Sequence, residues 1–82
     1  MQLKQALWRC RRGTRELDTV LMSFVKDCFE SLDSVDVSEL EQLFYQQDPE
    51  LAAWLCNDEP PPEAFAGIVA RIRAHKELRP HR

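Results

Sequence analysis

The densest group of polar side chains lies in residues 11–16, RRGTRE. An arginine guanidinium binds a carboxylate or a phosphate through paired hydrogen bonds, and the Glu16 carboxylate accepts hydrogen bonds from donors. Gly13 has no side chain, so the backbone of a partner can approach it closely. A docking site is therefore one interpretation. The other is structural: Gly13 forms a turn, Glu16 favours the start of the next helix, and the arginines are solvated. Spacing alone does not separate the two.

Trp8 and the arginines around it extend this candidate site toward the N-terminus. An aromatic ring beside guanidinium groups is typical of interface anchors, although packing against the rest of the protein also explains it. With Arg9, Arg11, Arg12 and Arg15, the composition also matches an RNA-binding segment. The pI near 5.3 and the lack of a recognised nucleic-acid-binding motif argue against a nucleic-acid partner.

The sequence contains no pattern typical of catalysis or metal binding. Its three cysteines and two histidines are not paired at ligand spacing, and no glycine-rich phosphate loop occurs. We therefore predict no catalytic residue, no metal site and no enzymatic activity. Cys10 and Cys28 fall on apolar helix faces and are predicted to be buried thiols, and His75 to be a solvated or capping residue. The odd number of cysteines indicates a reducing, cytoplasmic environment.

Charge is distributed unevenly along the chain. Residues 1–15 hold five basic side chains and no acid, residues 16–63 hold thirteen acids and one base, and residues 64–82 hold five bases and one acid. Basic ends and an acidic middle can pair with each other on folding, or present two faces to partners.

Apolar residues recur at helical spacing along nearly the whole chain, with no competing strand alternation. This spacing predicts an all-α protein, a compact five-helix bundle with short turns. A chain of 82 residues is expected to form one small domain over residues 1–82, ordered over about 3–78 and frayed at 79–82. The expected apolar positions are Leu3, Ala6, Leu7 and Cys10; Leu17, Val20, Leu21, Phe24, Cys28 and Leu32; Leu40, Leu43 and Phe44; Leu51, Trp54 and Leu55; and Phe65, Ile68, Val69 and Ile72.

Three helix starts have local signals. Asp36 and Glu39 have the spacing of a capping box, and Asp48 followed by Pro49 is typical of an N-cap and first helical residue. The last helix is expected to begin inside or just after the proline run, with Glu63 in its first turn.

Size and hydropathy limit what the protein can do alone. A thin core leaves little room for an internal ligand, which favours an interaction module with no stably bound cofactor. No apolar run approaches the roughly 18 residues that span a bilayer, so no membrane insertion is predicted. The first thirteen residues do not have the pattern of a secretory signal. Nothing specifies self-association, and we expect a monomer rather than an obligate oligomer.

Residues 8–18, WRCRRGTRELD, resemble the motif region of the succinate dehydrogenase assembly factor family. The RGxxE motif of that family matches Arg12, Gly13 and Glu16. A second block, DPELAAWL at residues 48–55, resembles the DPxL…WL segment of the family, and the resemblance spans about residues 3–74. Family members often have methionine where Thr14 stands and arginine where Gln5 stands. If that arginine contacts the partner, Lys4 substitutes for it here or the contact is lost.

The resemblance implies a compact five-helix fold. It also implies binding to the flavoprotein subunit of succinate dehydrogenase, and often of fumarate reductase, to promote covalent attachment of FAD to a partner histidine. In this picture Gly13 allows close docking, and Arg12 and Glu16 make polar contacts. Two alternatives stay open: an antitoxin-like protein that neutralises a membrane-associated toxin, and a small nucleic-acid-binding module. The partner-binding residues expected are Trp8, Arg11, Arg12, Gly13, Glu16 and Asp48.

Overall fold

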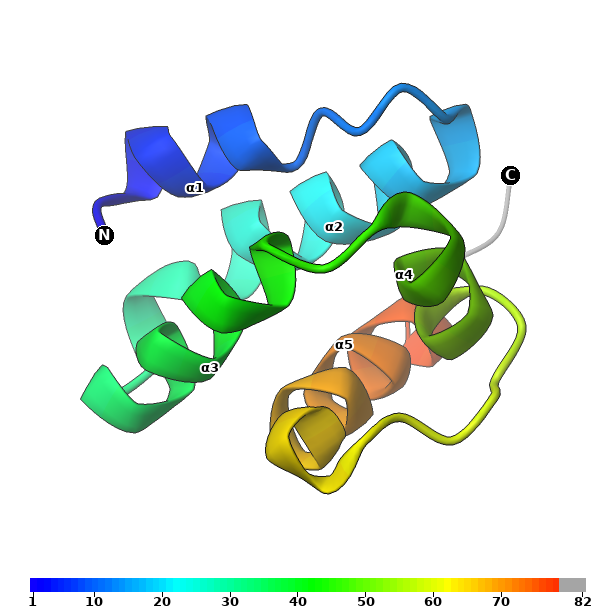
Figure 1. Ribbon diagram of the computed structural model, residues 1–82. Helices are drawn as coiled ribbons and strands as arrows, with labels where there is room; N and C mark the ends of the chain where they lie inside the picture. The colour runs from blue at the N-terminus through cyan, green and yellow to red at the C-terminus, as the bar shows by residue number, and fades with distance from the viewer. Residues whose placement is uncertain (79–82) are drawn as a thin grey trace.

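The structure, a computed structural model, describes residues 1–78 and contains five α-helices in that range (Figure 1). The prediction of an all-α, five-helix protein is therefore confirmed. The expected fraying of residues 79–82 lies outside the described residues. The elements are α1 (Leu3–Arg9), α2 (Arg15–Cys28), a 3-10 turn (Phe29–Ser31), α3 (Ser34–Phe44), α4 (Asp48–Leu55), a second 3-10 turn (Glu63–Phe65) and α5 (Ala66–Leu78).

Helix α2 lies at the centre of the packing. It contacts α1, α4 and α5, while α5 also packs against α3 and α4 (Figure 1). All five helices contribute to one hydrophobic cluster, as the apolar spacing predicts. Val25 is buried although it lies off the expected α2 face, because α2 is covered on more than one side. The buried residues of the cluster are Ala6, Cys10, Leu17, Leu21, Phe24, Val25, Leu40, Leu43, Phe44, Leu51, Trp54, Leu55, Ile68, Val69 and Ile72.

The start of α3 differs from the prediction. Its N-cap is Asp33, whose Oδ1 accepts a hydrogen bond from the backbone N of Asp36 at 2.8 Å. The Asp36 carboxylate instead pairs with Arg71 on α5 at 2.8 Å. Glu39 accepts from the backbone N of Ile68 at 3.3 Å, near the start of α5. The capping box was wrong because both of its acids bind partners that lie far along the chain.

The start of α4 is shifted by one residue from the prediction. Gln47 is the N-cap, and its backbone O accepts from the backbone N of Glu50 and of Leu51, both at 3.1 Å. Asp48 is the first helical residue, and Pro49 follows within the first turn. Asp48 is therefore not an N-cap, and its carboxylate is left to pair with Arg12.

His75 was wrongly interpreted as a solvated or capping residue. Its side chain is only 13% exposed, and its Nε2 lies 2.8 Å from Oδ2 of Asp27 on α2. The imidazole ring also meets the Phe24 ring edge-on, at 5.9 Å between centroids. Packing of α5 against α2 determines this environment.

Candidate functional site

The loop between α1 and α2 is fastened to the α3–α4 junction by a single side chain, Arg12. Its Nε donates to Oδ1 of Asp48 at 2.9 Å, and its Nη2 donates to the carbonyl of Gln46 at 3.0 Å. Its Nη1 donates to the carbonyl of Phe44 at 3.0 Å and, more weakly, to that of Arg9 at 3.3 Å. The Arg12 side chain is 17% exposed. These bonds use four of the five N–H groups of the guanidinium, so little of it is left for a partner.

The backbone of the same loop is held by Asp18, one turn into α2. Its Oδ1 accepts from the backbone N of Arg12 at 2.6 Å. Asp18 was not among the predicted site residues. Its position six residues after Arg12, in the first turn of a helix, is the only sequence signal that points to it. Arg12 is thus held through both its backbone and its side chain.

Gly13 has a backbone conformation that other residues rarely adopt. Its φ is +99°, and a Cβ built at this position would meet no atom within 4 Å. The turn therefore requires glycine for its backbone angle. The surface above it is open, so the close approach of a partner is also sterically possible.

Glu16 lies exposed in the first turn of α2. In the described part of the chain, no hydrogen bond or ion pair engages its carboxylate. The carboxylate lies near Cys56, where it contributes, after burial of the thiol, to a raised Cys56 pKa. Glu16 is therefore available to a partner at the edge of the α1–α2 loop.

Trp8 and Arg11 are both on the outside of the protein. Trp8 is 70% exposed, and the Arg11 guanidinium carbon lies 6.0 Å from the centroid of its ring. Trp8 does not pack into the core, so the structure leaves its ring open to a partner. By contrast, Asp48 is committed to Arg12. The predicted residues therefore fall into an exposed group (Trp8, Arg11, Gly13 and Glu16) and an internally paired group (Arg12 and Asp48).

The cysteines are free thiols in different surroundings. Cys10 is fully buried and donates from Sγ to the carbonyl of Ala6 at 3.2 Å. Burial, and then the nearby Asp18 carboxylate, raise the pKa of Cys10 to about 12. Cys28, predicted to be buried, is partly exposed because it lies at the last turn of α2. A thiol that stays protonated is a poor nucleophile and a poor metal ligand, so Cys10 is structural.

Two other kinds of feature, a metal site and a membrane-spanning helix, are absent from residues 1–78. No group of three or more histidine, cysteine, aspartate or glutamate side chains comes together as a metal site would require. None of the helices in this range is both long enough and apolar enough to cross a membrane.

Similarity to known proteins indicates the class of protein to which this chain is related. A protein of Haemophilus ducreyi named FAD assembly factor SdhE is 38% identical over 71 residues, which are 85% of this chain and 87% of the relative. The Vibrio cholerae protein of the same name is 44% identical over 73 residues, covering 83% of this chain and 80% of the relative. A third, from Legionella pneumophila strain Lens, is 39% identical over 67 residues, with 82% and 85% coverage. By their names these relatives are assembly factors.

The family described as "Flavinator of succinate dehydrogenase" matches residues 4–76. The protein belongs to this family, and the resemblance predicted from the RGxxE and DPxL…WL segments is confirmed. No solved structure matches the chain significantly.

Proposed function

We propose that this protein is an assembly factor that binds the flavoprotein subunit of succinate dehydrogenase and promotes the covalent attachment of FAD to it. The family match over residues 4–76 is the observation that carries the proposal. The relatives named FAD assembly factor support it independently. Members of this family act as assembly factors rather than enzymes, so the flavin chemistry belongs to the partner and its cofactor.

The protein acts by favouring one conformation of its partner. Attachment requires the acceptor histidine of the partner and the flavin to be aligned. A factor that binds the aligned state more tightly than other states increases its population. A difference of about 1.4 kcal/mol in binding free energy shifts that population tenfold. A small module without its own cofactor is sufficient for this role.

The exposed and the internally paired residues have different parts in this function. Trp8, Arg11 and Glu16 contact the flavoprotein subunit directly, and its backbone approaches over Gly13. Arg12 and Asp48 are positioning residues, because their charges already satisfy each other at 2.9 Å. This assignment is supported by the free Glu16 carboxylate and by the four internal hydrogen bonds of the Arg12 side chain.

Several finer features belong to the same proposal. The flavoprotein subunit of fumarate reductase is a second partner, since it undergoes the same modification. FAD is not held stably by this protein alone. The protein works as a monomer in the cytoplasm, where its three free cysteines stay reduced.

The test measures covalent flavin on the flavoprotein subunit of succinate dehydrogenase. The subunit is expressed with and without this protein, denatured, and examined for in-gel flavin fluorescence. We expect fluorescence to rise with the wild-type protein and to fall at least about tenfold with Glu16→Ala. Loss of one charge-assisted contact costs about 1.5–3 kcal/mol, and about 1.4 kcal/mol corresponds to tenfold, so a tenfold fall is the smallest effect expected.

Glu50→Ala is the matched control. Glu50 is also an exposed acid in the first turn of a helix, α4. Its replacement by alanine therefore removes the same charge and a similar interaction with the helix dipole. It should leave flavin attachment unchanged. Equal loss of fluorescence in the two variants would contradict the assignment of Glu16. Fluorescence that does not depend on this protein at all would contradict the proposed function.

A further inference from the structure

Unpaired positive charge is concentrated on α1, on the loop that follows it and at the first residue of α2. Within residues 1–78, no salt bridge involves Lys4, Arg9, Arg11 or Arg15. The bases of α5 are in the opposite situation: Arg71, Arg73 and Lys76 all pair with acids. The basic N-terminal block thus pairs with the acidic middle of the chain only through Arg12 and Asp48. Most of its charge is left for another molecule.

Two of these cations are held against exposed aromatic rings. The Arg9 guanidinium carbon lies 5.1 Å from the ring centroid of Tyr45, and Tyr45 is 65% exposed. Arg11 lies over Trp8 in a similar way, at 6.0 Å. An arginine stacked on a ring loses less side-chain entropy when it binds a second group. In the part of the chain that the structure describes, no hydrogen bond engages the guanidinium groups of Arg9 and Arg11, so their N–H groups are available to a partner.

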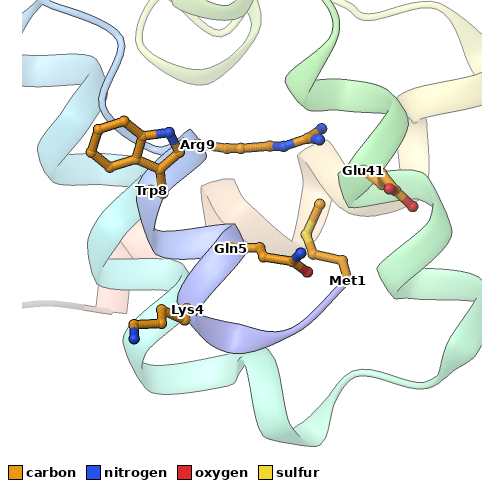
Figure 2. Close-up of a pocket in the computed structure, with 6 residues that line it drawn as sticks. All are labelled: Met1, Lys4, Gln5, Trp8, Arg9 and Glu41. Atoms are coloured by element: carbon orange, nitrogen blue, oxygen red, sulfur yellow. The ribbon is translucent and has the colours of Figure 1, made fainter.

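Lys4 and Trp8 lie one above the other on the outer side of α1, four residues apart, and Arg11 follows in the loop after the helix, where it lies over the Trp8 ring. Beside them is an open hollow of about 680 Å³ (Figure 2). Figure 2 shows the Arg9 side chain extending away from Trp8 toward α3, where Glu41 is the one acid of the wall. We call Lys4, Trp8, Arg9, Arg11 and Tyr45 the α1 face. The residues that line the hollow are Met1, Lys4, Gln5, Trp8, Arg9 and Glu41.

We propose that the α1 face is the docking surface for an acidic segment of the flavoprotein partner, whose carboxylates bind Lys4 and Arg11 beside the exposed Trp8 ring and Arg9 beside Tyr45. This inference rests on the proposed function and adds to it the chemistry of the partner surface. Charge complementarity carries it, because three unpaired cations stand beside two exposed aromatic rings.

An acidic protein segment fits this face better than a nucleic acid does. The molecule as a whole carries a net charge of −3, with thirteen acids in residues 16–63. A long phosphate backbone that left the α1 face would meet that acidic region and be repelled. A short run of carboxylates needs only the α1 face itself.

The first test is the association rate of this protein with the flavoprotein subunit at low and at high salt. Steering between opposite charges makes the rate depend on ionic strength. We expect the rate constant to fall on the order of tenfold between ~50 mM and ~500 mM NaCl. The double variant Lys4→Glu/Arg11→Glu should show a similar loss at low salt and little further salt dependence.

Lys26→Glu is the control, since Lys26 is also exposed and forms no salt bridge within the described residues, but lies on α2 and lines a different hollow from Lys4. It should change the rate less than about twofold, because a charge outside the α1 face contributes less to steering than one within it. Equal effects of Lys26→Glu and the double variant would overturn the proposal. Thermal unfolding of all variants confirms that they are folded.

A second test identifies the partner chemistry directly. A carbodiimide couples a carboxylate only to an amine in direct contact, and Lys4, Lys26 and Lys76 are the lysines of the chain. We expect an amide cross-link from Lys4 to an aspartate or glutamate of the partner and none from Lys26. Arg11→Lys should introduce a new cross-link. Coupling at Lys26 alone would place the interface elsewhere and contradict the proposal.

The outcomes keep the inference separate from the proposed function. Flavin attachment that needs this protein but is insensitive to salt and to the double variant would leave the function intact and reject the α1 face. Binding of single-stranded RNA that is lost in the double variant, without binding to the flavoprotein, would reject both and favour a nucleic-acid partner.

Discussion

At the scale of single residues, Arg11 and Arg12 show how neighbours of the same type acquire different roles. Arg11 is exposed and touches the Trp8 ring. Arg12 donates to Asp48 and to the carbonyls of Phe44 and Gln46, on a segment more than thirty residues away. The two side chains leave the loop in different directions, and the hydrogen bond from the Arg12 backbone N to Asp18 helps to hold this arrangement.

We predict that Arg12→Ala lowers the free energy of unfolding by about 2–3 kcal/mol. It removes charge-assisted hydrogen bonds and leaves the carbonyl of Phe44 and the Asp48 carboxylate without a donor. Arg11→Ala should change the stability by less than about 0.5 kcal/mol, as is usual for an exposed side chain. Urea unfolding followed by circular dichroism measures both. If the two variants are equally stable, the Arg12 contacts do not form in solution.

At the scale of elements, α4 depends on α5 for its C-terminal end. Arg73 donates from Nε to the carbonyl of Trp54 at 2.7 Å and from Nη2 to that of Glu59. Lys76 donates to the carbonyl of Leu55 at 2.8 Å. Positive groups at a helix C-terminus satisfy its free carbonyls and interact favourably with its dipole. These bonds also hold the segment that precedes the proline run against α5.

We expect Arg73→Ala to destabilise the protein by about 2 kcal/mol, because its side chain is only 25% exposed and bonds to backbone carbonyls of two different residues. Arg71→Ala is the comparison. Arg71 is 46% exposed and pairs with one carboxylate, so its loss should cost less than about 1 kcal/mol. In a chain of this size each kcal/mol lowers Tm by about 4–8 °C. A larger Tm decrease for Arg71→Ala would contradict this role of Arg73.

At the scale of the whole molecule, one buried thiol links stability to pH. The pKa of Cys10 is raised from 9.0 to about 12 by burial and by Asp18. The thiol therefore stays protonated in the folded state at a pH where the unfolded chain loses the proton. The contribution of this thiol to the free energy of unfolding is fully present below pH 9 and is lost as the pH rises toward 12.

We predict that the free energy of unfolding falls by up to about 1.4 kcal/mol per pH unit between pH 9 and 12 because of Cys10. Cys10→Ala removes the titrating group, so its stability should decrease less steeply over the same range. Urea titrations at several pH values compare the slopes, and Cys28 and Cys56 stay present in both proteins. Parallel slopes would show that the Cys10 thiol is not buried in solution.

The single domain over residues 1–82 stays a prediction, and the same titrations test it. One cooperative transition is expected from a chain in which all five helices share one hydrophobic cluster. Two separate unfolding transitions would show that the chain contains more than one independently unfolding unit.

The sequence by itself determined the helices, the apolar faces and the family. Helical spacing depends only on local geometry, so the periodicity of apolar residues is enough to assign Leu17, Leu21 and Phe24 to the core, where they lie. The motif segment also predicts Gly13 and Glu16 as partner-binding residues, and the structure leaves both exposed.

Only the tertiary structure decided which polar groups bind each other. Asp36, Asp48 and His75 have partners between 35 and 48 residues away. Local signals assigned them to caps or to solvent, since a carboxylate at a helix start has the same pattern whether or not a cation from another helix reaches it. The same reason separates Arg12 from Arg11: the acceptors are brought together by packing, and no spacing within the loop encodes them.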